Sequence, residues 1–229
     1  MAENQITRYQ LKKMVYVRIT LFFPVLAALF FLPAGRWNYW EAWIYIATLF
    51  IPMLFTLNYL LKNDPGLLER RMRMRETQSA QKKVVSLSLI YFLLAFLLPG
   101  FDKRFGWSNV PFYIALTADL FVLAGYLGVI QVFKTNSYAS RVVEVLKGQK
   151  VISTGPYAFV RHPMYTAVSF MYVFSPLALG SYWAMIPAAL IIPLLMARIK
   201  NEEKVLEKEL DGYKEYKQKT KYRLIPGIW

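Results

Sequence analysis

The chain has 229 residues, of which 56% are hydrophobic and 17% aromatic, a composition too apolar for an ordinary soluble domain. It contains no cysteine, which excludes a disulfide framework, a thiolate metal site and a cysteine nucleophile. The single histidine leaves zinc without its usual ligand set, so we expect no metal site. The net charge of +14 is compatible with nucleic-acid binding, and its placement decides that question.

Four apolar stretches reach the roughly 20 residues that a membrane-spanning helix needs. They cover residues 14–34, 40–61, 84–101 and 110–133. A fifth apolar block, 164–197, is broken near Gly180 and Ser181 into two arms. Each arm gives about 24 Å of helix, which is shorter than a hydrocarbon core of about 30 Å. The sequence therefore predicts an all-α, polytopic transmembrane helical bundle of four spans plus a C-terminal helical hairpin.

The basic residues are distributed asymmetrically between the two sides of the predicted membrane. If the N-terminus is cytoplasmic and the chain alternates sides, 25 Lys and Arg residues lie on the cytoplasmic side and only Arg36, Lys103 and Arg104 on the other. This is the positive-inside pattern. It predicts a multi-pass integral membrane protein with both termini in the cytoplasm. The basic residues then set the orientation of the chain in the membrane and bind anionic headgroups. We therefore expect the lipid bilayer, and no nucleic acid, as a partner.

The segments between the spans suggest a division of labour. Residues 1–133 are predicted to form the transmembrane scaffold, and 134–229 the catalytic region with its cofactor site on the cytoplasmic side. The loop 62–83 is expected to open with a turn and continue as a basic interfacial helix. The stretch 142–152 indicates two short extended runs about a Lys-Gly turn, which would pack over the site as a strap.

Asp119 is the one acidic residue deep inside a predicted span. An intramembrane carboxylate is unfavourable by a few kcal/mol and is therefore a functional candidate. The alternative is a structural hydrogen bond to Tyr or Thr on a neighbouring helix, and we favour that interpretation.

The segment 153–165 is polar and rich in turns, although apolar stretches surround it. Gly155-Pro156 and His162-Pro163 mark the turns. Tyr157, Arg161, His162 and Tyr165 lie between and after them. Irregular backbone beside a bilayer must be buried in protein or line a cavity, so this segment is the first candidate for a ligand site.

The C-terminal helix begins while the hairpin is ending. Arg198 and Glu202 are four residues apart and share one helical face at the membrane boundary. We interpret this pair as functional, whereas Glu203 and its neighbours Lys204, Glu207 and Lys208 are predicted to be solvated. Tyr213 and Tyr216 fit two roles equally, as interfacial anchors or as walls of a nucleotide-sized pocket.

Several motifs in the last hundred residues occur together in a known family. They are Gly155-Pro156-Tyr157, Arg161-His162-Pro163-x-Tyr165, Arg198-x-x-x-Glu202-Glu203-x-x-Leu206, Gly212-Tyr213-x-x-Tyr216 and Ile225-Pro226. With these motifs, residues 130–229 resemble the isoprenylcysteine carboxyl methyltransferase family and are similar to the related membrane phospholipid methyltransferases.

The resemblance implies a membrane-embedded methyltransferase that uses S-adenosyl-L-methionine without a Rossmann domain. The chain accordingly lacks a Gly-x-Gly-x-x-Gly motif. By this resemblance, Arg198 faces and binds the acceptor substrate, and Arg198, Glu202 and His162 form the catalytic set. The implied cofactor-binding residues are Gln149, Lys150, Val151, Ile152, Tyr157, His162, Pro163, Met164, Tyr165 and Glu202.

The chemistry of these residue types agrees with such roles. Glu202 can pair with the ammonium group of the cofactor, aromatic faces can hold its sulfonium or adenine, and His162 can hydrogen-bond its polar edge. A carboxylate acceptor is already ionised at neutral pH, whereas an amine requires a general base. No residue is an obvious dedicated base, which favours carboxyl O-methylation of a lipophilic, isoprenylcysteine-like substrate that arrives from the bilayer.

Three alternatives remain open at the level of sequence. The first is N-methylation of a phospholipid or another lipid, with His162, Glu202 or Glu203 as the base. The second is a membrane sterol reductase with NADPH, in which a similar Arg-His-Pro-x-Tyr motif commonly has Asn where this chain has Met164. The third is a non-enzymatic membrane scaffold. The sequence leaves the oligomeric state open.

Overall fold

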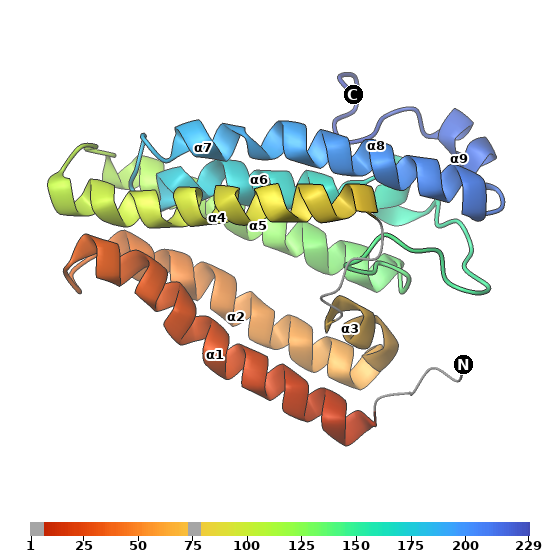
Figure 1. Ribbon diagram of the computed structural model, residues 1–229, viewed down its shortest axis with the longest axis horizontal. Helices are drawn as coiled ribbons and strands as arrows, with labels where there is room; N and C mark the ends of the chain where they lie inside the picture. Colours follow the sequence, from red (N-terminus) through yellow and green to blue (C-terminus); the bar gives the residue numbers. More distant parts are fainter. Residues whose placement is uncertain (1–6, 73–78) are drawn as a thin grey trace.

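The computed structural model describes residues 7–72 and 79–229, and this part of the chain forms helices without any strand (Figure 1). The elements are α1 (Arg8–Ala34), α2 (Trp40–Asn63), α3 (Pro65–Met72), α4 (Ser79–Phe105), α5 (Phe112–Thr135), the 3-10 helix η1 (Gly155–Ala158), α6 (Pro163–Ala178), α7 (Met185–Ala189), α8 (Ile191–Glu209) and α9 (Tyr213–Lys219).

The four predicted spans are confirmed. Helices α1, α2 and α5 and the Ser86–Phe105 part of α4 are long and apolar enough to cross a membrane. The first helix begins six residues earlier than predicted, where Thr7 and Gln10 form a capping box. The fourth element, α4, begins at Ser79 rather than at residue 84.

The C-terminal hairpin is also present, with α6 as its first arm. The second arm is divided into α7 and α8 at Leu190. Pro193 explains the break, because a proline has no N–H with which to bond the carbonyl of Ala189. In Figure 1, α4, α6 and α8 run in nearly the same direction, and α1 and α2 lie below them in the view. The two groups are in contact, because α1 packs against α4 and α2 packs against α5.

The connecting segments agree with the sequence in part. Helix α3 begins after the predicted turn at Asp64, whose side chain accepts a hydrogen bond from the backbone of Leu67 at 2.9 Å. Residues 73–78 of the predicted interfacial helix lie outside the described part of the chain. In the strap, the turn at Lys147-Gly148 is present and Gly148 has a φ of +75°. Its flanks do not pair as strands; Val145 and Val151 pack against Leu210, Tyr213 and Tyr216 instead.

Asp119 is 5% exposed and lies in α5. Its carboxylate interacts with the side chain of Thr48 of α2. Neither of its carboxyl oxygens completes a hydrogen bond with the described residues. The predicted Thr partner on a neighbouring helix is therefore present as Thr48, but its contact with Asp119 does not have the geometry of a full hydrogen bond. Asp119 also does not line the cavity described below.

Among the described helices, α5 and α6 make the most extensive contact. Helix α6 follows directly after the polar segment. A Cβ atom on Gly125 would lie 2.7 Å from the carbonyl oxygen of Ala167 and 2.8 Å from Cγ of Met171. On Gly128, about one turn further, it would lie 3.0 Å from the Cβ of Ala167 and 3.9 Å from the Cα of the same residue. Glycine is thus required at 125 for backbone approach, as in small-residue membrane packing.

Gly125→Ala is therefore expected to destabilise the bundle by roughly 1–3 kcal/mol, the usual range for overpacking. The clash outweighs the gain of up to about 1 kcal/mol in helix propensity. Gly128→Ala, the matched control, should have a smaller effect because its closest contact is longer and it meets no backbone atom within 3.4 Å. Thermal unfolding of the two purified variants in detergent measures the difference. Equal melting temperatures would contradict this packing.

Candidate functional site

A cavity of about 580 Å³ is lined by residues of α3, α9 and the start of α6, among other elements. These three lie toward the same end of the bundle (Figure 1). The volume of the cavity is within the range of small-molecule and cofactor sites. The wall is built from both halves of the sequence. Helices α3 and α4 contribute to it together with the segment 136–152, η1, α6, α8 and α9.

Helix α8 gives this cavity an internal order. The lining residues of α8 are Ile191, Leu195, Arg198, Glu202 and Leu206, which follow one another at intervals of three or four and therefore share one face. At a rise of 1.5 Å per residue, Arg198 and Glu202 are about 6 Å apart along the helix axis. The cavity thus passes from an apolar part, through a cation and then an anion, to a second apolar part.

Aromatic rings dominate the part of the cavity beyond Glu202. Tyr157, Tyr213 and Tyr216 line it together with Val151 and Leu206. The hydroxyl of Tyr157 accepts a hydrogen bond from the amide of Asn136, and the hydroxyl of Tyr216 donates to the carbonyl of Tyr157, both at 2.7 Å. The Tyr213 hydroxyl is buried and has no hydrogen-bond partner among the described residues. It is a free polar group in an otherwise apolar wall.

The hydroxyl of Tyr165 connects the anion and the cation of α8. It donates to Oε2 of Glu202 at 2.6 Å and accepts from Nε of Arg198 at 2.8 Å. Arg198 also donates through Nη2 to the carbonyl of Arg141 at 2.8 Å. These contacts hold the side chains of Arg198 and Glu202 in the cavity wall.

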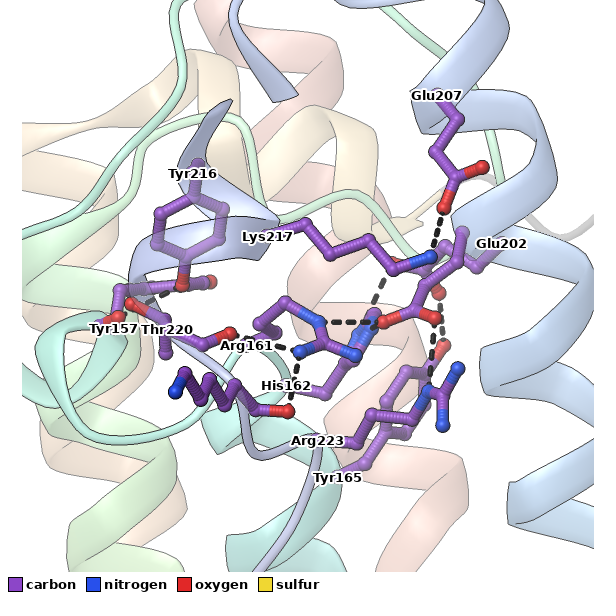
Figure 2. Close-up of polar contacts among 12 residues, drawn as sticks. Tyr157, Arg161, His162, Tyr165, Glu202, Glu207, Tyr216, Lys217, Thr220 and Arg223 are labelled. Atoms are coloured by element: carbon purple, nitrogen blue, oxygen red, sulfur yellow. Dashed lines mark hydrogen bonds and ion pairs between the residues drawn. The ribbon is translucent and has the colours of Figure 1, made fainter. Parts of the chain in front are cut away.

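Glu203 is buried and forms ion pairs with Arg161 and Arg223, two of the residues labelled in Figure 2, so the prediction that it is solvated is wrong. Its side chain is 4% exposed and accepts hydrogen bonds from Nε of Arg161 at 2.7 Å and Nε of Arg223 at 2.8 Å. The Nε2 atom of His162 lies 3.3 Å from the same carboxylate. Burial by itself raises the pKa of Glu203, but the hydrogen bonds from His162, Arg161 and Arg223 outweigh it and hold the pKa well below the ordinary value.

The same cluster fastens the C-terminal segment to the Arg-His-Pro turn. The backbone N–H groups of Arg161 and His162 donate to the carbonyls of Tyr222 and Arg223. Nη1 of Arg161 donates to the carbonyls of Thr220 and Lys221 at 2.8 and 2.7 Å (Figure 2). The position of the turn therefore depends on the last ten residues of the chain as well as on α8.

His162 lies between the two neighbouring glutamates. It is 5% exposed, with Nε2 near Glu203 and Nδ1 3.9 Å from Oε1 of Glu202. This placement makes His162 a link between the buried cluster and the cavity wall.

Most of the site residues that the sequence singled out converge on this cavity. Its lining includes Gln149, Lys150, Val151, Ile152, Tyr157, His162, Met164, Tyr165, Arg198 and Glu202. Pro163 does not line it; it is buried at the first position of α6. Sequence reasoning missed Asn136, Arg71 and the α4 residues Ser86, Leu89 and Phe92, which also belong to the wall. No local pattern identifies them, because chain folding alone brings them to the cavity.

Comparison with known proteins agrees with this grouping. Residues 115–208 match the family model of the isoprenylcysteine carboxyl methyltransferase family, a match that runs from α5 into the last turn of α8. It supports a membrane methyltransferase of the isoprenylcysteine carboxyl methyltransferase type. The comparison with curated proteins finds no match.

Proposed function

We propose that the protein, whose residues 115–208 match the family model of the isoprenylcysteine carboxyl methyltransferase family, transfers a methyl group from S-adenosyl-L-methionine to a lipophilic acceptor. The acceptor we favour is the carboxylate of an isoprenylcysteine-like molecule. The observation that carries the proposal is the order of groups along α8. Apolar residues, Arg198 and Glu202 follow one another there, with Tyr165 joining the two charged groups.

The residues of the cavity fit the cofactor. Glu202 offers an anion for its ammonium group, and Tyr157, Tyr213 and Tyr216 offer aromatic faces for its adenine or its sulfonium. The unpaired Tyr213 hydroxyl offers a further polar contact. The strap, with Gln149 to Ile152, closes this part of the cavity. When bound, S-adenosylmethionine supplies an electrophilic methyl group on a sulfonium centre.

The protein residues contribute alignment and exclusion of water to methyl transfer. Arg198 orients the acceptor, and Glu202 holds the cofactor end of the site. Burial raises the pKa of both Tyr157 and Tyr216 to about 12, so these phenols stay neutral and do not act as bases at physiological pH. His162 is held between two carboxylates. This arrangement favours an acceptor that is already ionised, such as a carboxylate, over an amine.

The basic end of the bundle gives the proposed orientation. The start of α1, α3 and α9 lie at the same end as the cavity (Figure 1). We propose that this end faces the cytoplasm, since it carries most of the basic residues. The acceptor then arrives from the bilayer with its head at this end. We retain residues 134–229 as the catalytic region, with α3 and α4 completing its wall.

Calorimetric titration of the detergent-purified protein tests the cofactor directly. S-adenosylhomocysteine is expected to bind saturably, and NADPH, titrated in parallel, is expected not to bind. NADPH binding alone would move the chain to the reductases, and no binding of either would favour a scaffold. Methyl transfer to N-acetyl-S-farnesylcysteine, compared with transfer to phosphatidylethanolamine, then distinguishes carboxyl from amine acceptors.

A further inference from the structure

Arg71 brings a second guanidinium group to the cavity from a part of the chain outside the family match. It lies near the end of α3, and its Nη1 donates to the carbonyl of Ser140 at 3.2 Å. Its guanidinium carbon lies 5.2 Å from the centroid of the Phe133 ring. No carboxylate of the described residues lies within ion-pair distance of Arg71, although its side chain lines the cavity. A charge in such a place is stabilised by a counterion.

Arg71 and Arg198 both donate hydrogen bonds to the same short segment of backbone. Arg71 holds the carbonyl of Ser140, and Arg198 holds the next carbonyl, that of Arg141. Consecutive Cα atoms are 3.8 Å apart, so the two guanidinium groups bind neighbouring peptide units, and Arg198 is close enough for its charge to act on Arg71. The Arg141 side chain lines the same cavity. Burial lowers the pKa of Arg71, and the positive charges of Arg141 and Arg198 lower it further.

The surroundings of Arg71 and Arg198 indicate what kind of molecule supplies an anion for Arg71. On one side, Tyr165 and Glu202 lead to the proposed cofactor end. On the other side, Phe92 of α4, Tyr172 of α6 and the α8 residues Ile191 and Leu195 form an apolar cluster. An anion bound at Arg71 and Arg198 would therefore lie between this apolar cluster and the proposed cofactor site. This geometry matches the charged head of a lipid with its tail among α4, α6 and α8.

We propose that Arg71 is a specificity-determining residue that binds the anionic head of the acceptor together with Arg198. The inference rests on the proposed function and goes beyond it, because it assigns acceptor selection to α3. Two adjacent guanidinium groups attract a carboxylate or phosphate and repel an ammonium group. The site therefore accepts lipids with a compact anionic head and rejects amine acceptors.

The test compares Arg71→Gln with Arg70→Gln in the full-length, detergent-purified protein. Arg70 is the matched control: it is the preceding residue of the same helix, loses the same charge, and does not line the cavity; it donates to the carbonyl of Ser137 instead. Each variant is loaded with S-adenosylhomocysteine and titrated with N-acetyl-S-farnesylcysteine and, separately, with its uncharged carboxamide. Phosphatidic acid and phosphatidylethanolamine in mixed micelles are used as competitors.

Arg71→Gln is expected to weaken binding of the acid about 10- to 100-fold, the loss typical of a removed charge-assisted contact. Its affinities for the carboxamide and for S-adenosylhomocysteine should stay within about twofold of those of the unmodified protein, and Arg71→Lys should restore part of the loss. If phosphatidic acid competes in an Arg71-dependent way and the thioether acid does not, the anion site serves a phosphate headgroup. Equal loss for acid and carboxamide, or no loss, overturns the proposal. Failure of the unmodified protein to bind S-adenosylhomocysteine instead overturns the proposed function.

Discussion

Glu203→Gln is expected to destabilise the protein by about 3–5 kcal/mol, as removal of one partner from a buried ion pair does. Glu203 and Arg161 are 4% and 3% exposed, so neither charge is compensated by water. Without the carboxylate, Arg161 and Arg223 lose the anion that they share. A fall in the melting temperature of roughly 10 °C follows for a chain of this size. Thermal unfolding in detergent at neutral pH measures it.

The pH dependence of this effect follows from the direction of the pKa shift. Because the pKa of Glu203 is depressed in the folded protein, its contribution is fully present above the ordinary glutamate pKa of about 4.3 and decreases as the pH falls below that value. The gap in melting temperature between the unmodified protein and Glu203→Gln should therefore be largest near pH 7 and narrow in more acidic buffer. A gap that widens on acidification would show that the carboxylate does not stabilise the fold.

The transmembrane part of the fold follows directly from the sequence, because a bilayer imposes both the length and the apolar character of a span. The four spans and the hairpin break near Gly180 were predictable for this reason. Helix ends were less so: α1 and α4 extend beyond the apolar stretches, since backbone hydrogen bonding continues where hydrophobicity stops. The flanks of the strap were predicted as extended runs because of their valines, which pack on Leu210 and Tyr213 instead.

The site was predictable only where its residues are close in sequence. Tyr157, His162 and Tyr165 share one segment, and Arg198 and Glu202 share one helical face. Glu203 was misinterpreted because its partner Arg161 is 42 residues earlier and Arg223 is 20 residues later. Its position four residues after the buried Ile199 was the one local sign that it faces inward.

Arg71 shows the same limit more strongly. In the sequence it belongs to a basic stretch of the kind that binds headgroups, and nothing there separates it from Arg70. The structure separates the two. Arg71 lines the cavity and Arg70 does not, because adjacent residues of a helix point in directions about 100° apart. The contribution of α3 to the site is thus a property of tertiary packing.

Glu202→Gln is expected to weaken S-adenosylhomocysteine binding strongly while leaving the fold intact, the opposite of the effect at Glu203. Glu202 is 24% exposed at its side chain, and Arg161 and Arg223 donate to Glu203 rather than to Glu202, so the charge of Glu202 is available to a ligand. Loss of a charge-assisted contact in a partly buried site weakens binding by about 10- to 100-fold, equivalent to roughly 1.4–2.8 kcal/mol. The glutamine still accepts a hydrogen bond from Tyr165, which preserves the local structure. Calorimetric titration measures the affinity, and the melting temperature reports the fold.

Glu207→Gln is the matched control for this prediction. Glu207 lies on the same helix and pairs with Lys217 at 2.5 Å, with both side chains about one-third exposed. An exposed pair of this kind contributes little to stability, so both affinity and melting temperature should stay close to those of the unmodified protein. Small and equal effects at Glu202 and Glu207 would remove Glu202 from the cofactor site. If Glu202→Gln loses only affinity and Glu203→Gln loses only stability, the two adjacent glutamates have different roles. Glu202 then binds the ligand and Glu203 stabilises the fold.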